Sequence, residues 1–152
     1  MHRVLAVLVP LAICLGACAS PEDHPQVLFR AVRVDVSPTE PLARAYVRAI
    51  PVVTNELPLP VTAETLEEAA ATAETPVGFT GADGTVALGL YPELPYIVEV
   101  LPPITSDLAA RSREGGVGRW SWRYEPGTGE IASTAVGDAN DGSVQLELVE
   151  PR

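Results

Sequence analysis

The sequence VGFTGADGTVALGLYPELPYIVEV, residues 77–100, decides the fold of this chain. It contains three short runs rich in apolar and β-branched residues, which are separated by residues 81–84 (GADG) and residues 91–95 (YPELP). Glycine and aspartate supply the backbone conformations of a tight turn, and proline does not fit the interior of a strand. The stretch therefore predicts a β-hairpin over residues 77–88, a second turn, and a strand over residues 96–100.

Two further strands are predicted on the N-terminal side of this stretch. Residues 31–36 place Val32, Val34 and Val36 at alternate positions, which is the period of a half-buried strand. Residues 43–53 repeat the pattern, and Pro51 places the end of that strand at a sheet edge. The two faces of this second strand are Ala45, Val47 and Ala49 on one side, and Arg44, Tyr46 and Arg48 on the other.

Residues 65–74 show a different period. Leu66, Ala69, Ala70 and Ala73 follow the spacing of one stripe of a helix. Thr65 and Glu68 have the spacing of a capping box, and Thr75-Pro76 ends the segment. We expect one short helix here, lying against a sheet.

The C-terminal third predicts a meander of three strands, over residues 119–124, 131–136 and 144–148, with turns at residues 126–129 and 138–142. In the first of them, Trp120, Trp122 and Tyr124 share one face, while Arg119, Ser121 and Arg123 share the other. About seven short strands with one short helix indicate an all-β protein, an antiparallel β-sandwich of the Greek-key type.

The N-terminus has the features of a secretion signal. A positive start, Met1 to Arg3, is followed by an uncharged run over residues 4–15, which is too short to span a bilayer as a helix. The next residues, Leu15-Gly16-Ala17-Cys18, resemble the lipobox of bacterial lipoproteins. That resemblance implies cleavage before Cys18 and lipidation of its thiol, with fatty acyl chains such as palmitate. The alternative is an ordinary secretory signal with an incidental cysteine.

This division predicts a signal peptide over residues 1–17, a lipidated Cys18 with a tether up to residue 26, and a sandwich domain over residues 27–150. Two or more acyl chains hold a protein stably on a membrane. The membrane is therefore an expected partner through Cys18. Ala19 follows the cysteine in place of the aspartate linked to inner-membrane retention, which favours the outer membrane where the source has one.

Composition limits the chemistry of the mature chain. Because Arg3 leaves with the signal, nine arginines face 20 acidic residues, a formal charge of about −11 that disfavours nucleic acid as a partner. Cys14 and His2 lie in the signal, Cys18 is assigned to the lipid and His24 to the tether, and the chain has no lysine. This inventory excludes nucleophile–histidine pairs, histidine-ligated zinc and Schiff-base lysines from the folded domain. We expect neither a cofactor nor a bound metal, and no enzymatic activity.

Residues 79–100 resemble the carboxypeptidase-regulatory-like modules of the transthyretin-like sandwich superfamily. The matching features are a threonine, an Asp-Gly turn, an alternating apolar strand, a proline corner and a tyrosine that begins the next strand. In this chain they are Thr80, Asp83-Gly84, Val86 and Leu88, Pro92 and Tyr96. The resemblance implies a transthyretin-like sandwich that serves as a non-catalytic stability or interaction unit, with no active-site residues to transfer.

One segment of the acidic chain concentrates arginine and tryptophan. The candidate partner-binding residues are Arg111, Arg113, Arg119, Trp120, Trp122 and Arg123. Such residues could form a stacking and charge surface for an anionic glycan or a protein. In the alternative, both tryptophans and Tyr124 point into the core, and Arg119 and Arg123 balance neighbouring acids outside. Asp138, Asn140 and Asp141 miss the spacing of a calcium loop, and a plain turn is expected there.

We therefore expect a lipid-anchored, non-catalytic envelope protein that acts as a structural or protein- or glycan-binding β-sandwich. The alternatives are a carboxylate-based envelope hydrolase and a carrier of a small apolar ligand. Two close carboxylates, one with a raised pKa, would favour the hydrolase. A large apolar cavity would favour the carrier, and a filled core with an exposed tryptophan would favour the binding module.

Overall fold

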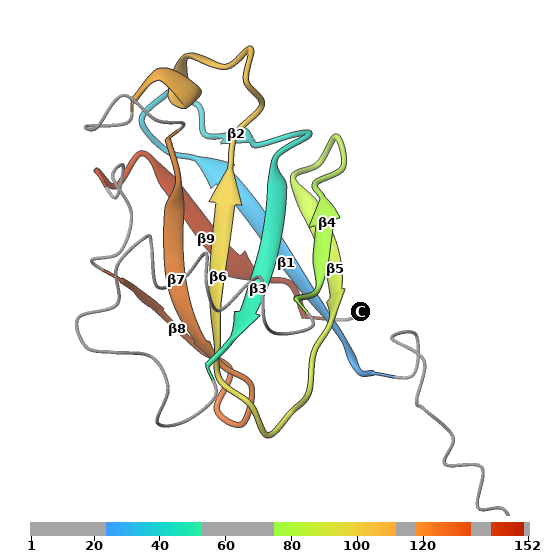
Figure 1. The fold of residues 1–152 in the computed structure, drawn as a ribbon. Coiled ribbons are helices and arrows are strands. Elements are labelled where there is room, and N and C mark those ends of the chain that lie inside the picture. Colours follow the sequence, from blue (N-terminus) through green and yellow to red (C-terminus); the bar gives the residue numbers. More distant parts are fainter. Residues whose placement is uncertain (1–23, 53–74, 112–117, 135–140, 151–152) are drawn as a thin grey trace, which may run out of the picture.

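A computed structural model describes residues 24–52, 75–111, 118–134 and 141–150. They form two antiparallel β-sheets that pack against each other, with one 3-10 helical turn, Asp107–Ala110 (Figure 1). The strands are β1 (Gln26–Arg33), β2 (Glu40–Pro41), β3 (Tyr46–Pro51), β4 (Val77–Phe79), β5 (Thr85–Gly89), β6 (Tyr96–Leu101), β7 (Trp120–Glu125), β8 (Glu130–Ser133) and β9 (Val144–Leu148). The predicted all-β antiparallel sandwich is confirmed. The helix predicted over residues 65–74 lies outside the described residues.

The first sheet is built around β1. On one side β1 pairs with β5 and, further along, with β2, while on the other side it pairs with β9. The second sheet has the order β4-β3-β6-β7-β8, and every pair in it is antiparallel. The edge strands β4 and β5 belong to different sheets and follow each other along the chain (Figure 1).

The core lies between the two sheets and follows the alternation in the sequence. The faces predicted for β3 and β7 are confirmed, because Ala45, Val47 and Ala49 are buried, as are Trp120, Trp122 and Tyr124. Phe29 of β1 meets the ring of Tyr124 edge-on, with centroids 5.1 Å apart, so the aromatic residues of the two sheets pack directly together.

The first strand differs from its prediction in extent and in face. It spans Gln26–Arg33, and Phe29 and Ala31 belong to the core cluster between the sheets. Val32 is also buried, whereas Val34 and Val36 lie beyond the end of the strand. The strand ends at Arg33 because the following residues make other contacts: Val34 donates its backbone N–H to Ser143, and Asp35 forms ion pairs.

The hairpin predicted over residues 77–88 is wrong in its pairing, although the turn itself is present. Gly84 adopts a φ of 79°, and its N–H donates to the carbonyl of Gly81 at 3.0 Å. This turn carries the chain from β4 in one sheet to β5 in the other. A Cβ at Gly78 would lie 2.7 Å from a methyl group of Val86, so the two strands pack face to face across the core.

The meander predicted at the C-terminus is half right. β7 and β8 pair as neighbouring antiparallel strands, with Trp122 opposite Ser133. β9 instead pairs with β1 in the other sheet, where Phe29 lies opposite Leu148. An alternating apolar pattern specifies a half-buried strand but does not specify which sheet it joins, and the free side of β1 supplied the better partner.

Candidate functional site

The structure describes most of the predicted binding residues, whereas Cys18 and Arg113 lie outside the described residues. Trp120 and Trp122 are 1% and 6% exposed and belong to the core between the sheets. Neither indole ring therefore offers a face on which a glycan could stack. The alternative arrangement, with both tryptophans in the core and the arginines outside, is the one observed.

Arg123 lies at the surface of the second sheet. Its Nε donates to Oε1 of Glu125 at 2.6 Å, and both side chains are partly exposed to solvent. Exposed pairs of this kind contribute about 0–1 kcal/mol to stability because water screens them. Among the predicted arginines that the structure describes, Arg123 has the most exposed side chain, at 49% against 31% for Arg111 and 20% for Arg119.

Arg119 takes part in a row of charges across the second sheet, on the face that points away from the core. Its Nη1 lies 3.7 Å from Oε1 of Glu99, while Arg48 Nε donates to Oε2 of the same carboxylate at 2.5 Å. Glu99 is fully buried, so these two guanidinium groups compensate for the removal of its charge from water. The sequence contains an indication of this buried charge, since Glu99 is the acidic residue in the otherwise apolar strand β6.

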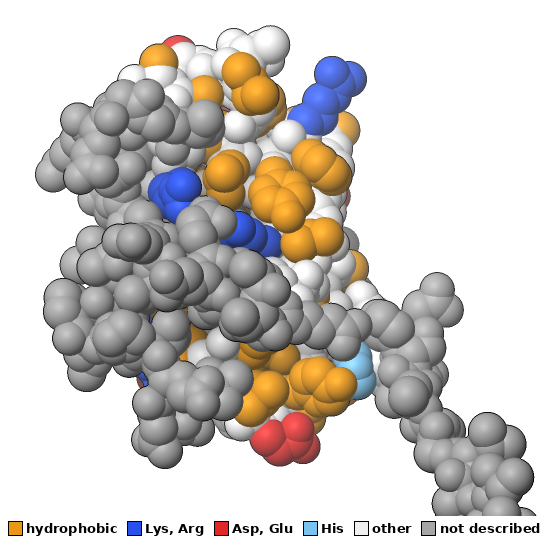
Figure 2. Space-filling view, viewed as in Figure 1, with side chains coloured by type: hydrophobic (Ala, Val, Ile, Leu, Met, Phe, Trp, Pro, Cys, Tyr) orange, Lys and Arg blue, Asp and Glu red, His pale blue; other side chains and the backbone are white. Residues whose placement is uncertain are grey.

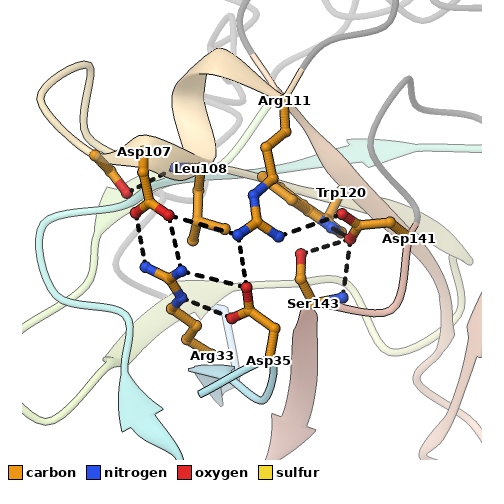
Figure 3. A network of polar contacts seen from close by, with 9 residues as sticks. Arg33, Asp35, Asp107, Leu108, Arg111, Trp120, Asp141 and Ser143 are labelled. Carbon is orange, nitrogen blue, oxygen red and sulfur yellow. Dashed lines mark hydrogen bonds and ion pairs between the residues drawn. The ribbon is translucent and has the colours of Figure 1, made fainter.

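Arg111 belongs to a polar network at the end of β1 (Figure 3). Arg33 donates through Nε and Nη2 to both carboxylate oxygens of Asp35, and through Nη1 and Nη2 to both oxygens of Asp107, the latter at 2.7 and 2.8 Å. Arg111 Nη2 donates to Asp35 at 2.6 Å. The network thus connects the end of β1 to the helical turn Asp107–Ala110, which follows β6 of the other sheet.

The same network reaches the core through Asp141. Its Oδ1 accepts hydrogen bonds from the backbone N–H of Ser143 at 2.9 Å, from the Ser143 hydroxyl at 2.5 Å, and from Trp120 Nε1 at 3.3 Å (Figure 3). Arg111 Nη1 lies 3.5 Å from its other oxygen. A buried indole N–H requires an acceptor, and Asp141 provides it. The residues that precede β9 and begin β7 are thereby held together.

The carboxylates of this network are held in the ionised form. Hydrogen bonds from Arg33, together with Arg111, lower the pKa of Asp35 to about 2, and Arg33 also lowers the pKa of Asp107. Burial by itself would raise the pKa of Asp141, but hydrogen bonds from Ser143, Trp120 and Arg111 together lower it. A general acid that works near neutral pH needs the opposite shift. These acids are therefore suited to a structural role as permanent anions.

A pocket of about 440 Å³ lies near the start of β1, between the edge strands β4 and β5 and beneath the turn at residues 91–95. Its wall is largely apolar and includes Pro51, Pro76, Val77, Leu88 and Leu94. None of the described residues that line it is acidic, although the chain carries 20 acids. The volume and lining are those of small-molecule sites in proteins.

The polar residues that line the pocket are His24, Thr75, Tyr91 and Tyr96. The ring of His24 lies against that of Tyr91, with centroids 3.9 Å apart. The backbone N–H of Tyr91 donates to the hydroxyl of Tyr96 at 2.9 Å, and burial raises the pKa of Tyr96, so this phenol stays neutral. This site could not be predicted from the sequence, because its residues come from separate segments between His24 and Tyr96.

Apolar side chains are also exposed on the outer face of β3 and β4. Phe79 is 69% exposed and Val77 is 53% exposed. The Phe79 ring lies beside that of Tyr46, its cross-strand neighbour, at a centroid distance of 5.4 Å. Figure 2 shows hydrophobic side chains gathered over these strands. Val77 connects this surface to the pocket, because it also lines the pocket wall.

In residues 24–52, 75–111, 118–134 and 141–150, no three His, Cys, Asp or Glu side chains gather so that they could hold a metal ion. Within the same ranges, no helical segment has the length and apolar character needed to cross a bilayer. No protein-family model, curated protein sequence or solved structure gives a significant match to this chain.

Proposed function

We propose that this chain is a lipid-anchored, non-catalytic protein of the bacterial envelope whose β-sandwich acts as a structural or binding module. The observation that carries the proposal is the segment Leu15-Gly16-Ala17-Cys18 after an uncharged run, placed just before a folded domain. Only residues 19–23 separate Cys18 from His24, whose ring already lies on Tyr91 of the domain. A lipid on Cys18 would hold the sandwich close to the membrane, and Ala19 favours the outer membrane.

The polar contacts of the domain support a module in preference to a hydrolase. Asp35, Asp107 and Asp141 have lowered pKa values and join strands of the two sheets. Charges fixed in this way stabilise a scaffold, whereas carboxylate catalysis of hydrolysis depends on one acid with a raised pKa. The apolar pocket favours a second candidate function, the carriage of a small apolar ligand.

Mass spectrometry of the mature protein, purified from membranes, tests the anchor. We expect a chain that begins at Cys18 and carries the mass of a diacylglyceryl group with its acyl chains. A Cys18→Ser variant should keep residues 1–17 and carry no lipid. In a detergent phase separation, it should not be recovered with the lipidated protein. A chain with a free thiol at position 18 would contradict the proposal.

The binding role is tested at Arg123, since Trp122 lies in the core and its replacement would disturb folding. Wild-type protein, Arg123→Ala and Arg30→Ala are each cross-linked in intact envelopes and compared. Arg30 is a suitable control because it lies on the other sheet, where it donates to the Asp83 carbonyl at 3.3 Å. A protein or glycan partner that uses this charge should be lost from Arg123→Ala only. Equal capture by all three proteins would exclude this surface.

A further inference from the structure

The pocket between β4 and β5 combines a largely apolar wall with a few polar groups, among them His24 and Tyr96. We infer that it binds a fatty acid, with the acyl chain between the two sheets and the carboxylate at His24 and Tyr96. Val77, Leu88 and Leu94 contribute hydrocarbon surface to the pocket wall. Transfer of one methylene group from water to such a wall strengthens binding by about fourfold.

The hydroxyl of Tyr96 favours a ligand that carries a hydrogen-bond acceptor. The Tyr96 hydroxyl accepts a hydrogen bond from Tyr91, so its own hydrogen remains available for donation. Between the described residues, the hydrogen bond found at this hydroxyl is the one that it accepts from Tyr91. Tyr96 is almost completely buried, and a donor buried in this way gains from an acceptor brought by a ligand. A carboxylate oxygen supplies that acceptor.

Charge around the pocket favours an anion over a cation. His24 is the one basic residue among the described lining residues, and no acidic residue is found among them. The rest of the chain is strongly acidic, with a formal charge of −10. An anionic ligand therefore meets less repulsion here than at the acidic surfaces of the domain. The pocket volume of about 440 Å³ suits one acyl chain better than a two-chain phospholipid.

The length of chain before His24 places the pocket near a source of fatty acids. This step rests on the proposed function, because it requires the lipid on Cys18. Residues 19–23 span at most about 20 Å even when fully extended. An anchored sandwich would therefore hold the pocket within that distance of the bilayer surface, where fatty acids partition.

Titration of a fluorescent sixteen-carbon fatty acid into the mature chain, made with Ser at position 18 so that it carries no lipid, tests the inference. We expect saturable binding at one site, with palmitate as a competitor. Laurate, shorter by four methylene groups, should compete at least tenfold less well. Hexadecanol should also compete less well, because it lacks the negative charge. Binding that is non-saturable, or that ignores chain length, would overturn the inference.

Substitutions locate the site. Ala87→Trp places a bulky ring at the pocket, where Ala87 is exposed, and should weaken binding at least tenfold. Ala132→Trp is the matched control, since Ala132 is an exposed alanine of β8 in the other sheet, and it should bind as the wild type does. His24→Gln should reduce the preference for palmitate over hexadecanol. If Ala87→Trp binds as well as Ala132→Trp, the ligand lies elsewhere and the inference is wrong.

The lipidated protein distinguishes an external fatty acid from the anchor's own acyl chain. Reconstituted in detergent micelles, it should bind the same probe with an affinity within about threefold of the lipid-free chain. Binding that is confined to the lipid-free chain would show that an acyl chain on Cys18 fills the pocket, and would overturn the inference in its present form. Fatty-acid binding is first measured on the lipid-free chain. That measurement therefore tests the pocket even if Cys18 proves to carry no lipid.

Discussion

The two ends of β1 differ in the side chains that surround them: charged groups at one end and mainly apolar groups at the other. At its C-terminal end, Arg33 enters a network of charges that joins both sheets and reaches Trp120 in the core. Near its N-terminal end, next to His24, lies a largely apolar pocket of about 440 Å³. At one end of this strand, ion pairs and hydrogen bonds connect the two sheets, whereas at the other end the domain contains an apolar pocket.

The largest expected effect is the loss of Trp120, which lies at the junction of the network and the core. Trp120→Ala should lower the free energy of unfolding by about 4 kcal/mol, because it leaves a large cavity and removes one of the hydrogen-bond donors to Asp141. Tyr91→Ala at the pocket rim should cost about 1 kcal/mol or less, since the side chain is half exposed. Urea denaturation measures both. Equal losses would mean that the two ends contribute alike to stability.

The next effect is expected at Asp35, which accepts hydrogen bonds from Arg33 and Arg111. Asp35→Asn should cost about 2 kcal/mol, since bonds between charged groups contribute more than neutral ones. Glu125→Gln, which breaks the exposed pair with Arg123, should cost about 0.5 kcal/mol or less. A smaller loss for Asp35→Asn than for Glu125→Gln would show that the network does not hold the sheets together.

Acid should weaken the charged end selectively. The folded pKa of Asp35 is lowered to about 2, below its ordinary value of about 4, so its stabilising contribution is complete above pH 4 and is lost as the pH falls towards 2. Thermal unfolding followed between pH 5 and pH 2 should show a steeper decline for the wild type than for Asp35→Asn. The melting temperature of Tyr91→Ala should fall with pH as steeply as that of the wild type. A shallower decline would show that the acid sensitivity is not confined to the charged end of β1.

The smallest expected effect is that of Ala87→Trp on stability. Because Ala87 is exposed and the new ring would occupy open space, the free energy of unfolding should change by about 0.5 kcal/mol or less. The same urea titration measures it alongside the other variants. A loss above about 2 kcal/mol would indicate that the pocket end, too, is closely packed and intolerant of change.

Local patterns in the sequence predicted the strands well. The period-two faces of β3 and β7 placed Val47, Trp120 and Trp122 correctly, because a sheet with one face on the core demands that alternation. The fold class followed from the number and spacing of such runs. The tight turn at residues 81–84 was also visible, since Gly84 adopts a positive φ.

Relations between distant segments were not predictable in the same way. The turn at residues 81–84 suggested a hairpin, but a tight turn reverses the chain without deciding whether the next strand pairs beside the first or packs across from it. Arg33 binds Asp107, and Arg111 binds Asp35, although these partners are 74 and 76 residues apart in the sequence. Nothing local distinguishes these acids from the others in the chain, so neither the network nor the pocket could be predicted.

The pairing of β1 with β9 has a consequence for how the chain matures. Phe29, near the beginning of the domain, lies opposite Leu148, which comes almost at its end. The first sheet therefore cannot be completed until the last residues are available, and a chain still being synthesised or threaded through a membrane keeps one side of β1 unpaired. Contacts of such long range delay folding. A chain that must cross a membrane unfolded would gain from this delay, since its structure would close only after its final strand arrives.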